Sequence, residues 1–224
     1  MGLRPPGEFI PVAEQTGLIR RIDKWVLRQA CSQVQSWREE GLLPFRLAVN
    51  TSAPDLTDDL SASVRDIASE TGFPPQDLDI EITERTLGED DAISHEILAD
   101  LKRLGVRIAI DDFGVDYSSL SRLRSFPVDV LKIDRTFVHD LEYEGRVMAP
   151  SLVALAHNLG VEVVAEGVET PRQLARLKEA GCMLAPATFW RRQLRPRSFG
   201  SGCSWVPGAP RFKGEASPAS DSNR

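Results

Sequence analysis

The chain has 224 residues, of which 42% are hydrophobic and 27% are charged, and this is the composition of a globular protein with one sizeable core. It contains no run of about 18 apolar residues and no apolar signal core at its N-terminus, which excludes a membrane span and argues against export. Cys31, Cys182 and Cys203 are scattered, so they form no disulfide framework and suit a reducing cytoplasm.

The net charge of −6 is unevenly distributed. Residues 183–224 contain seven Arg or Lys and two acidic residues, which gives this segment +5 and leaves −11 for residues 1–182. The acidic body argues against a DNA- or RNA-binding face and is compatible with a site for a divalent metal ion. Because residues 183–224 are also rich in Pro, Gly and Ser, we expect a divergent, disordered tail there, and a nucleic-acid-binding arm is the less favoured alternative.

Helical and strand patterns alternate along most of the chain. In chain order, the patterns predict a helix at 19–40, a strand at 46–50, a helix at 60–70, a strand at 78–84, a helix at 92–104, strands at 107–112 and 128–134, a helix at 148–159, a strand at 161–166 and a helix at 170–180. Short strands rich in Val and Ile, alternating with helices, indicate a parallel sheet covered by helices.

Two parallel architectures compete, an open doubly wound sheet and a closed barrel. Each of the five predicted strands ends in a carboxylate, an amide or an amine, which is typical of a TIM-type barrel with its site at the carboxyl ends of many strands. An open sheet concentrates its site at one switch point, and no Gly-rich phosphate loop follows any strand here. The sequence therefore favours the α/β barrel.

The polar groups at the strand ends predict the chemistry. They are Asn50, Glu81, Glu84, Asp111, Asp112, Lys132, Asp134, Glu166 and Glu169. So many carboxylates in one barrel mouth would repel one another, and Mg²⁺ or Mn²⁺ with all-oxygen ligands would relieve that repulsion. The adjacent pair Asp111 and Asp112 suits two metal ions, which favour in-line attack on a phosphodiester. Lys132 can then offset charge on a phosphate oxygen or orient the attacking water.

Simpler interpretations stand beside this one. An isolated acid at a strand end is often a helix cap or a solvated loop residue, and for Asp134 the cap of a following helix is the favoured role. For Glu84 the two interpretations stand about even. The strand-end carboxylates and Lys132 alone would also suit enolase-type proton abstraction on a barrel.

Seven motifs occur in order and resemble one family. They are Glu-Phe-Ile-Pro-Val-Ala-Glu at 8–14, Val-Asn at 49–50, Glu-Ile-Thr-Glu at 81–84, Asp-Asp-Phe-Gly at 111–114, Tyr-Ser-Ser-Leu at 117–120, Leu-Lys-Ile-Asp at 131–134 and Ala-Glu-Gly-Val-Glu-Thr at 165–170. From about Gly7 to Cys182 the chain resembles the EAL family of bacterial cyclic-di-GMP phosphodiesterases. This resemblance argues against the enolase-type alternative.

The resemblance implies a modified TIM barrel that hydrolyses one phosphodiester bond of cyclic-di-GMP to linear pGpG with the help of Mg²⁺ or Mn²⁺. By the same resemblance, Asn50, Glu81, Asp111 and Asp112 match the metal ligands, Lys132 and Glu166 match the catalytic groups that position and activate the attacking water, and Glu84 matches the residue that braces the loop after Asp112. Glu169 falls in the same site motif. Relatives often dimerise, which leaves a homodimer open for this chain.

The chain departs from the family pattern in three places, and each departure leads us to expect impaired or absent activity. The Glu-Ala-Leu motif would precede Gly7, so we expect the first barrel strands and one metal-ligating Glu to be absent and the EAL domain, residues 1–182, to be partial. Val115 and Asp116 replace a Thr and a Gly in the brace loop, and Pro186-Ala187 stands in register with a Gln-Gly. A degenerate domain that binds a nucleotide or a protein without hydrolysis is the alternative function, and a product that does not fold stably is a third outcome.

Overall fold

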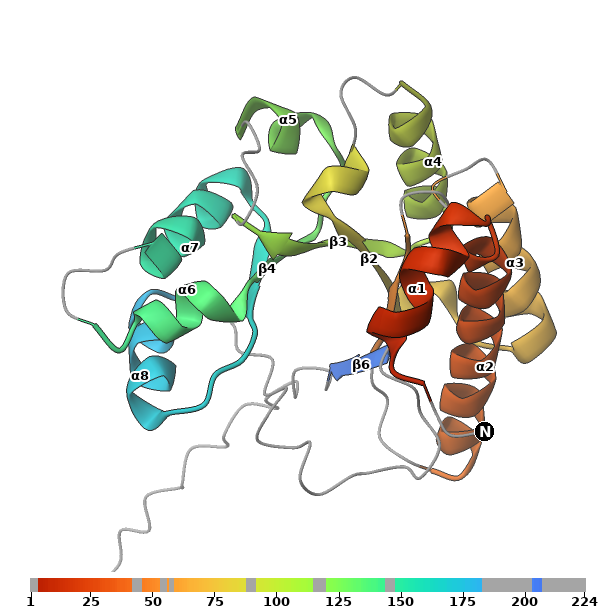
Figure 1. The fold of residues 1–224 in the computed structure, drawn as a ribbon, viewed down its shortest axis with the longest axis horizontal. Coiled ribbons are helices and arrows are strands. Elements are labelled where there is room, and N and C mark those ends of the chain that lie inside the picture. The colour runs from red at the N-terminus through yellow and green to blue at the C-terminus, as the bar shows by residue number, and fades with distance from the viewer. Residues whose placement is uncertain are drawn as a thin grey trace, which may run out of the picture.

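The computed structural model describes residues 4–41, 46–52, 56, 59–87, 92–114, 120–143, 148–182 and 203–206, which fold into one sheet with surrounding helices (Figure 1). The strands are β1 (Arg46–Asn50), β2 (Leu78–Thr83), β3 (Arg107–Phe113), β4 (Val130–Ile133), β5 (Glu162–Ala165) and β6 (Cys203–Val206). The α-helices are α1 (Pro6–Gln15), α2 (Ile19–Glu39), α3 (Asp59–Thr71), α4 (Ala92–Arg103), α5 (Leu120–Ser125), α6 (Arg135–Asp140), α7 (Met148–Leu159) and α8 (Pro171–Glu179). Two short 3-10 helices, η2 (Pro75–Asp77) and η3 (Glu84–Leu87), flank β2.

The order of the strands identifies the architecture. Strands β1 to β5 are parallel and lie side by side in chain order, so each new strand is added on the same side of its predecessor. A doubly wound sheet reverses its direction at a switch point, whereas the strands of a TIM-type barrel continue in one direction. The prediction of a barrel-type α/β fold is confirmed, and all five predicted parallel strands are present with ends that differ by at most two residues.

The outer face of the parallel sheet forms the main hydrophobic core. Successive residues of a strand point to opposite faces, and one set is strongly apolar. Ile80, Ile108 and Leu131 belong to this set and are almost completely buried against the helices. In Figure 1, helices α2, α3 and α4 lie at the right of the view, and α6, α7 and α8 lie at the left, where α7 contacts β4 and β5. At about 25 cal/mol per Å², each such fully buried aliphatic side chain contributes about 1.5–3 kcal/mol to folding.

The other face of the strands has a small apolar layer of its own. Ala109, Val130 and Val164 come from three neighbouring strands and form a cluster separate from the main core. By the alternation of side chains, Arg107, Asp111 and Lys132 share this face with the cluster. The interior of the barrel is therefore layered, with a thin apolar layer between two charged ends.

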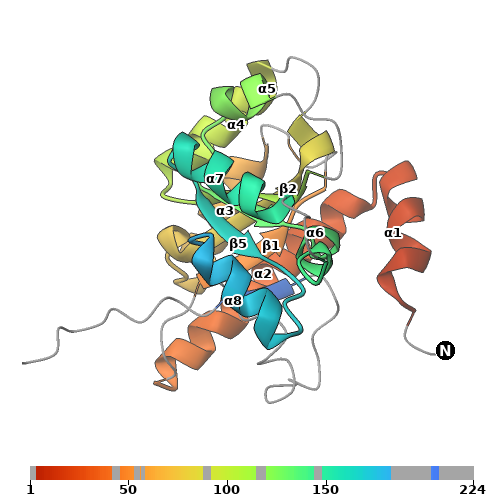
Figure 2. The same ribbon diagram turned by 90° about the vertical axis from the view of Figure 1, so that its left-hand side faces the viewer.

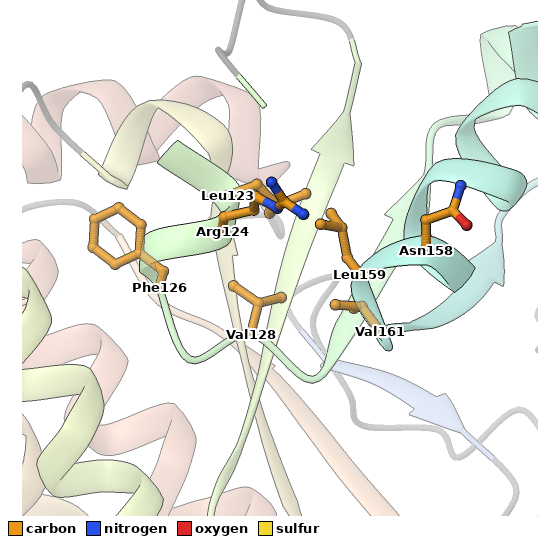
Figure 3. A pocket seen from close by; sticks show the side chains of 7 residues that line it. All are labelled: Leu123, Arg124, Phe126, Val128, Asn158, Leu159 and Val161. Atoms are coloured by element: carbon orange, nitrogen blue, oxygen red, sulfur yellow. The ribbon is translucent and has the colours of Figure 1, made fainter. Parts of the chain in front are cut away.

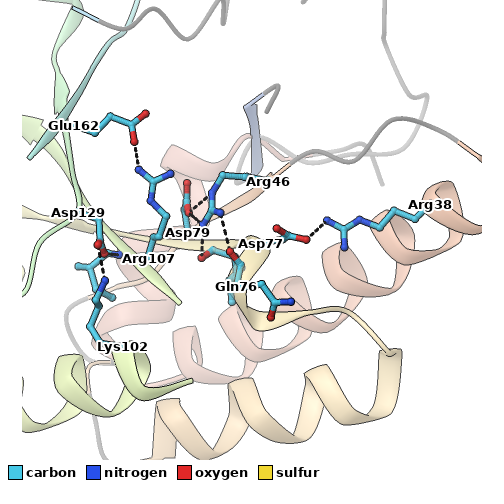
Figure 4. Close-up of polar contacts among 11 residues, drawn as sticks. Arg38, Arg46, Gln76, Asp77, Asp79, Lys102, Arg107, Asp129 and Glu162 are labelled. Carbon is cyan, nitrogen blue, oxygen red and sulfur yellow. Dashed lines mark hydrogen bonds and ion pairs between the residues drawn. The ribbon is translucent and has the colours of Figure 1, made fainter. Parts of the chain in front are cut away.

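At the amino ends of the strands the charges are paired (Figure 4). Arg46 at the start of β1 binds Asp79 of β2 and the carbonyl oxygen of Gln76. Arg107 at the start of β3 binds Glu162 at the start of β5 and so reaches past β4. Pairs that neutralise one another in this way fit a structural role, since the amino-end face of such a barrel typically serves stability.

Strand β6 pairs antiparallel with β1, in the register Arg46 with Val206 and Val49 with Cys203. It thereby covers the outer edge of β1, where unpaired backbone groups would otherwise be exposed. These four residues lie in the segment for which the sequence predicted a disordered tail, and they form a strand. The other residues of 183–224 lie outside the described residues.

The sequence patterns did not assign α1 and α5, and they indicated α6 only through the expected cap at Asp134. Helix α1 was missed because it contains Pro11, and a proline inside a helical pattern normally ends the helix. Its other proline, Pro6, lies in the first turn, where proline is well tolerated. Helices α5 and α6 have six residues each, which is too short for an apolar period to stand out. Figure 2 shows α1 at the margin of the molecule, beside α2. No described helix is both long and apolar enough to span a bilayer.

Candidate active site at the strand ends

Side chains from β2, β3, β4 and the end of β5 meet around one ammonium group. Nζ of Lys132 lies 2.9 Å from Oε2 of Glu81, 3.0 Å from Oδ1 of Asp111 and 2.7 Å from Oε1 of Glu166. Parallel strands bring their carboxyl ends to one edge of the sheet, so residues far apart in sequence converge there. Four of the residues predicted from the sequence are thus brought together.

Burial and charge set the protonation of this cluster. Burial raises the pKa of Glu81 to about 7, Lys132 opposes the rise, and Asp111 and Glu166 add to it. Burial alone would lower the pKa of Lys132, but Glu81, Asp111 and Glu166 together raise it above its ordinary value. Lys132 therefore remains an ammonium ion that holds three carboxylates in place.

Asp112 lies next to this cluster, with an unusual backbone. Its φ of 53° is in the left-handed region, which Asp tolerates better than most residues, and its backbone N–H donates to Oδ1 of Asp111 at 3.0 Å. Its side chain faces solvent, yet partial desolvation raises its pKa, with further contributions from Asp111, Asp134 and Glu166. The negative charges of the neighbouring acids thus make Asp112 harder to ionise.

Asn50 is the last residue of β1 and stands opposite Glu81 in the β1–β2 register. Its side chain is exposed, and the pairing continues one residue further because the N–H of Thr51 donates to the carbonyl oxygen of Glu81 at 2.8 Å. Asn50 and Glu81 are therefore neighbours at the same edge of the sheet. The position of Asn50 therefore adds a side-chain amide, whose oxygen can ligate a metal ion, to the same end of the sheet as the carboxylates.

Glu84 lies just after β2, at the start of η3. Its Oε2 accepts a hydrogen bond of 3.4 Å from the N–H of Gly114, two residues after Asp112. Its Oε1 is buried and has no hydrogen-bond partner among the described residues. Val115 and Asp116, the residues that depart from the family pattern, lie outside the described residues.

Two further predicted residues do not join the Lys132 cluster. Asp134 caps α6, because its Oδ1 accepts from the N–H of Thr136 at 2.8 Å and also from the hydroxyl of Thr136. Burial alone would raise the pKa of Asp134, but the hydroxyl and then the N–H of Thr136 lower it below its ordinary value. The prediction of a cap is confirmed. Glu169 lies 3.7 Å from Nε2 of His139.

The loop after β5 positions Glu166. Gly167 has φ of 68°, and a Cβ atom built on it would lie 2.6 Å from Cβ of Arg135. Further along, Oε1 of the buried Gln173 accepts from the N–H groups of Glu169 and Thr170 at 2.7 and 3.0 Å, which forms a capping box at the start of α8. The sequence analysis missed Gln173, although Thr170 followed by Gln173 is a capping-box signal.

The donor set can be compared with the metal ions that the sequence suggested. Among the described residues, no group of three Asp, Glu, His or Cys side chains is arranged to hold a metal ion. The groups themselves are carboxylate and amide oxygens, which fit Mg²⁺ and Mn²⁺ in chemistry. In this structure three of the carboxylates turn toward Lys132, which acts as the internal cation of the site.

A separate pocket of about 260 Å³ lies on the outside of the barrel (Figure 3). It is lined by Leu123, Arg124, Phe126, Val128, Asn158, Leu159 and Val161. Val128 and Val161 precede β4 and β5, so the pocket lies near the amino ends of these strands, away from Lys132. None of the predicted site residues lines it, and its walls carry no acid or nucleophile.

A barrel of parallel strands with acids and a lysine at the carboxyl ends of its strands defines the class of protein. The sequence matches the EAL domain family over residues 1–186, and the chain belongs to this family. It is 40% identical over 200 residues to the signalling protein YkoW of Bacillus subtilis, and 41% identical over 196 residues to the cyclic di-GMP phosphodiesterase NbdA of Pseudomonas aeruginosa. These matches cover 88% and 86% of this chain but 25% of each relative, so the chain spans about a quarter of the length of these relatives.

Solved structures agree with the sequence matches. The chain is 42% identical to the PaMucR phosphodiesterase, solved as a c-di-GMP complex, with a TM-score of 0.76 over 82% of this chain and 76% of that one. It is also 42% identical to the EAL domain of Mycobacterium smegmatis DcpA, with a TM-score of 0.66 over 71% of this chain and 73% of that one. The predicted family is confirmed.

Proposed function

We propose that this chain carries a cyclic-di-GMP phosphodiesterase site that hydrolyses one phosphodiester bond of cyclic-di-GMP to linear pGpG, and that its turnover is impaired. The supporting observation is the contact of Lys132 with Glu81, Asp111 and Glu166 at the mouth of the barrel. Relatives whose names include cyclic di-GMP phosphodiesterase share 37–42% identity with this chain.

Each residue has a role in this proposal. Asn50, Glu81, Asp111 and Asp112 supply oxygen ligands for Mg²⁺ or Mn²⁺, which when bound would offset charge on the phosphate and favour ionisation of a water molecule. Glu166 is the most exposed of the three partners of Lys132, with 35% of its side chain accessible, so it is placed to take a proton from the attacking water. Lys132 keeps its proton and orients Glu166.

The reaction is a hydrolysis in which water supplies the attacking oxygen. A new bond forms between the water oxygen and phosphorus while one phosphorus–oxygen bond of the ring breaks, and the released ribose oxygen takes up a proton. The positive charge of Lys132 would offset charge on the phosphate when the carboxylates bind cations. The ring opens, and one end carries the phosphate.

The environment of Glu84 supports the proposal that turnover is impaired. Oε1 of Glu84 is buried and finds no partner among the described residues, and an unsatisfied buried acceptor costs about 1–3 kcal/mol. Val115 follows Gly114, the residue that Glu84 binds, and brings no hydroxyl group to the loop. The same observation favours a second candidate, a domain that binds cyclic-di-GMP or a protein without hydrolysing the nucleotide.

Conversion of cyclic-di-GMP to pGpG by the purified chain, with Mg²⁺ or Mn²⁺, tests the proposal. We expect slow turnover that Asp111→Ala abolishes and that Val115→Thr increases, because threonine restores the hydroxyl that the family pattern has at this position. Turnover that is insensitive to Asp111→Ala would overturn the site. Binding of cyclic-di-GMP without turnover in both the native chain and Val115→Thr would establish the binding module.

Location and assembly belong to the same proposal. The scattered cysteines support the proposal of a cytoplasmic location. A homodimer is proposed by analogy with relatives, and light scattering over a range of protein concentrations tests it. We also propose that DNA and RNA are not ligands, on the basis of the acidic charge of residues 1–182.

A further inference from the structure

The helix that precedes β1 places one acid beside the candidate site. In a parallel α/β unit, a helix runs opposite to the strand that follows it, so its first turns lie at the carboxyl end of that strand. Asp23 is the fifth residue of α2, and α2 packs directly on β1. Asp23 is therefore level with Asn50, although 27 positions separate them in the sequence.

Asp23 makes two hydrogen bonds to one residue of the chain segment that leaves β1. Its Oδ2 accepts from the N–H of Ser52 at 3.2 Å and from Oγ of Ser52 at 3.0 Å. Bonds to an ionised carboxylate are about twice as strong as bonds between neutral groups. Ser52 follows Asn50 by two residues, so the pair of bonds fixes the backbone just beyond Asn50.

A third bond fixes the residue between them. Thr51 is buried, and its N–H donates to the carbonyl oxygen of Glu81 at 2.8 Å. Asn50 therefore precedes two consecutive anchored residues, one tied to β2 and the other to α2. Without the Asp23 bonds, Ser52 would lose its tie to α2, and the turn that ends β1 would depend on the Thr51 bond.

We propose that Asp23 is a positioning residue that holds the turn after β1 and so aims the side-chain amide of Asn50 toward Glu81. This inference rests on the proposed function, because it assigns a purpose to the position of Asn50 as an oxygen ligand. Asp23 acts through Ser52 and touches neither ligand nor metal. The simpler alternative is that the Asp23–Ser52 pair only adds stability at the surface of α2.

Four variants separate these two roles in the full-length chain. Asp23→Ala removes both bonds, whereas Ser52→Ala removes the hydroxyl bond and keeps the bond from the backbone N–H. The double variant removes no more of the link than Asp23→Ala does, and Asp23→Asn keeps a side-chain oxygen that can still accept from Ser52. Lys24→Ala is the matched control, because Lys24 is exposed on the same turn of α2. Mn²⁺ binding by calorimetry, hydrogen exchange at Thr51 and Ser52, and thermal unfolding are measured for each.

We expect Asp23→Ala to weaken Mn²⁺ binding about tenfold, which is the size of effect seen when a residue that orients a metal ligand is removed. Ser52→Ala should weaken it less, because the backbone N–H of residue 52 still donates to Asp23. The double variant should bind Mn²⁺ as Asp23→Ala does, because Asp23→Ala alone already breaks both bonds. The Mn²⁺ affinity of Asp23→Asn should stay within about threefold of that of the native chain, and Lys24→Ala should bind Mn²⁺ as tightly as the native chain does. Exchange at Thr51 and Ser52 should accelerate in Asp23→Ala alone among the variants at positions 23 and 24.

Other outcomes would overturn the inference. Native Mn²⁺ affinity in Asp23→Ala, or losses that add in the double variant, would show that Asp23 does not act through Ser52. If the native chain binds no Mn²⁺, the proposed metal site fails, and hydrogen exchange still decides about Asp23. Unchanged exchange at Thr51 and Ser52 in Asp23→Ala would then refute the positioning role by itself.

Discussion

The ammonium group of Lys132 lies 2.9 Å from Oε2 of Glu81, and both side chains are more than nine-tenths buried. Lys132 belongs to β4 and Glu81 to β2, so this ion pair reaches past β3 inside the barrel. A buried ion pair adds little stability relative to an apolar pair, but removing one partner leaves the other charge buried and unpaired, which is strongly destabilising. The pair therefore ties the protonation of the site to the folding of the domain.

Lys132→Met tests the role of the ammonium group. Without metal at pH 8, we expect the variant to lose about 3–5 kcal/mol of unfolding free energy, because Glu81, Asp111 and Glu166 lose their counter-ion. Mg²⁺ should then raise the melting temperature of the variant more than that of the native chain, since cations bound to the folded state stabilise it. Lys178→Met, at an exposed position, is the control.

A loss of stability in Lys132→Met with no larger response to Mg²⁺ would contradict this prediction. It would mean that Lys132 contributes packing rather than charge.

The raised pKa of Glu81 predicts a pH dependence of stability. The folded-state pKa is about 7 and the ordinary value is 4.5, so the folded chain keeps a proton that the unfolded chain loses between these values. The stabilisation is fully present below pH 4.5 and is lost as the pH rises to about 7, on the order of 3 kcal/mol in total. Urea unfolding of metal-free protein at pH 5 and pH 7.5 measures it.

Glu81→Gln should flatten this dependence, whereas Glu179→Gln, at an exposed position of α8, should leave it as in the native chain. Equal slopes in the native chain and Glu81→Gln would show that Glu81 does not retain its proton on folding.

Gly167 and Gly160 form a matched pair for testing the close approach beside Glu166. Their φ angles are 68° and 71°, so alanine at either position carries a similar left-handed strain. A Cβ at position 167 would lie 2.6 Å from Cβ of Arg135, whereas a Cβ at 160 meets nothing within 4 Å. We expect Gly167→Ala to cost about 1–3 kcal/mol more than Gly160→Ala in urea unfolding. Equal costs would mean that Arg135 moves aside freely.

Strand β6 makes a prediction about the edge of β1. Removal of residues 203–224 leaves the outward backbone groups of β1 without the partner that β6 provides. Amide exchange in Arg46–Asn50 should accelerate at least about tenfold, while Arg107–Phe113, which lies between two strands, should keep its rate. Unchanged exchange in β1 would show that β6 does not stay paired in solution.

Local patterns were sufficient for most of the fold. Helix α7 and strand β1 have the predicted bounds, because apolar period and flanking Gly or polar residues agree at both. The convergence of Glu81, Asp111, Lys132 and Glu166 followed from their common place at strand ends. The pattern did not reveal that Lys132 would bind the three carboxylates, since the sequence suggested a phosphate as its partner.

What the sequence did not reveal depends on contacts distant in the chain. Asp23 binds Ser52 across 29 positions, and no local signal marks such a pair. Strand β6 pairs with β1 over more than 150 positions and arises in a segment whose composition predicts disorder. Pairing of this kind is selected by the free edge of the sheet rather than by the propensity of the four residues.

The layered interior of the barrel separates two ends that can be altered independently. Arg107 and Asp111 are four residues apart on β3, which is about 13 Å along a strand, with Ala109 between them. Because Arg107 is neutralised by Glu162, its field is that of a short dipole and fades over this distance. Substitutions among the paired charges at the amino ends can therefore adjust the robustness of the scaffold while the acids around Lys132 keep their affinity for protons.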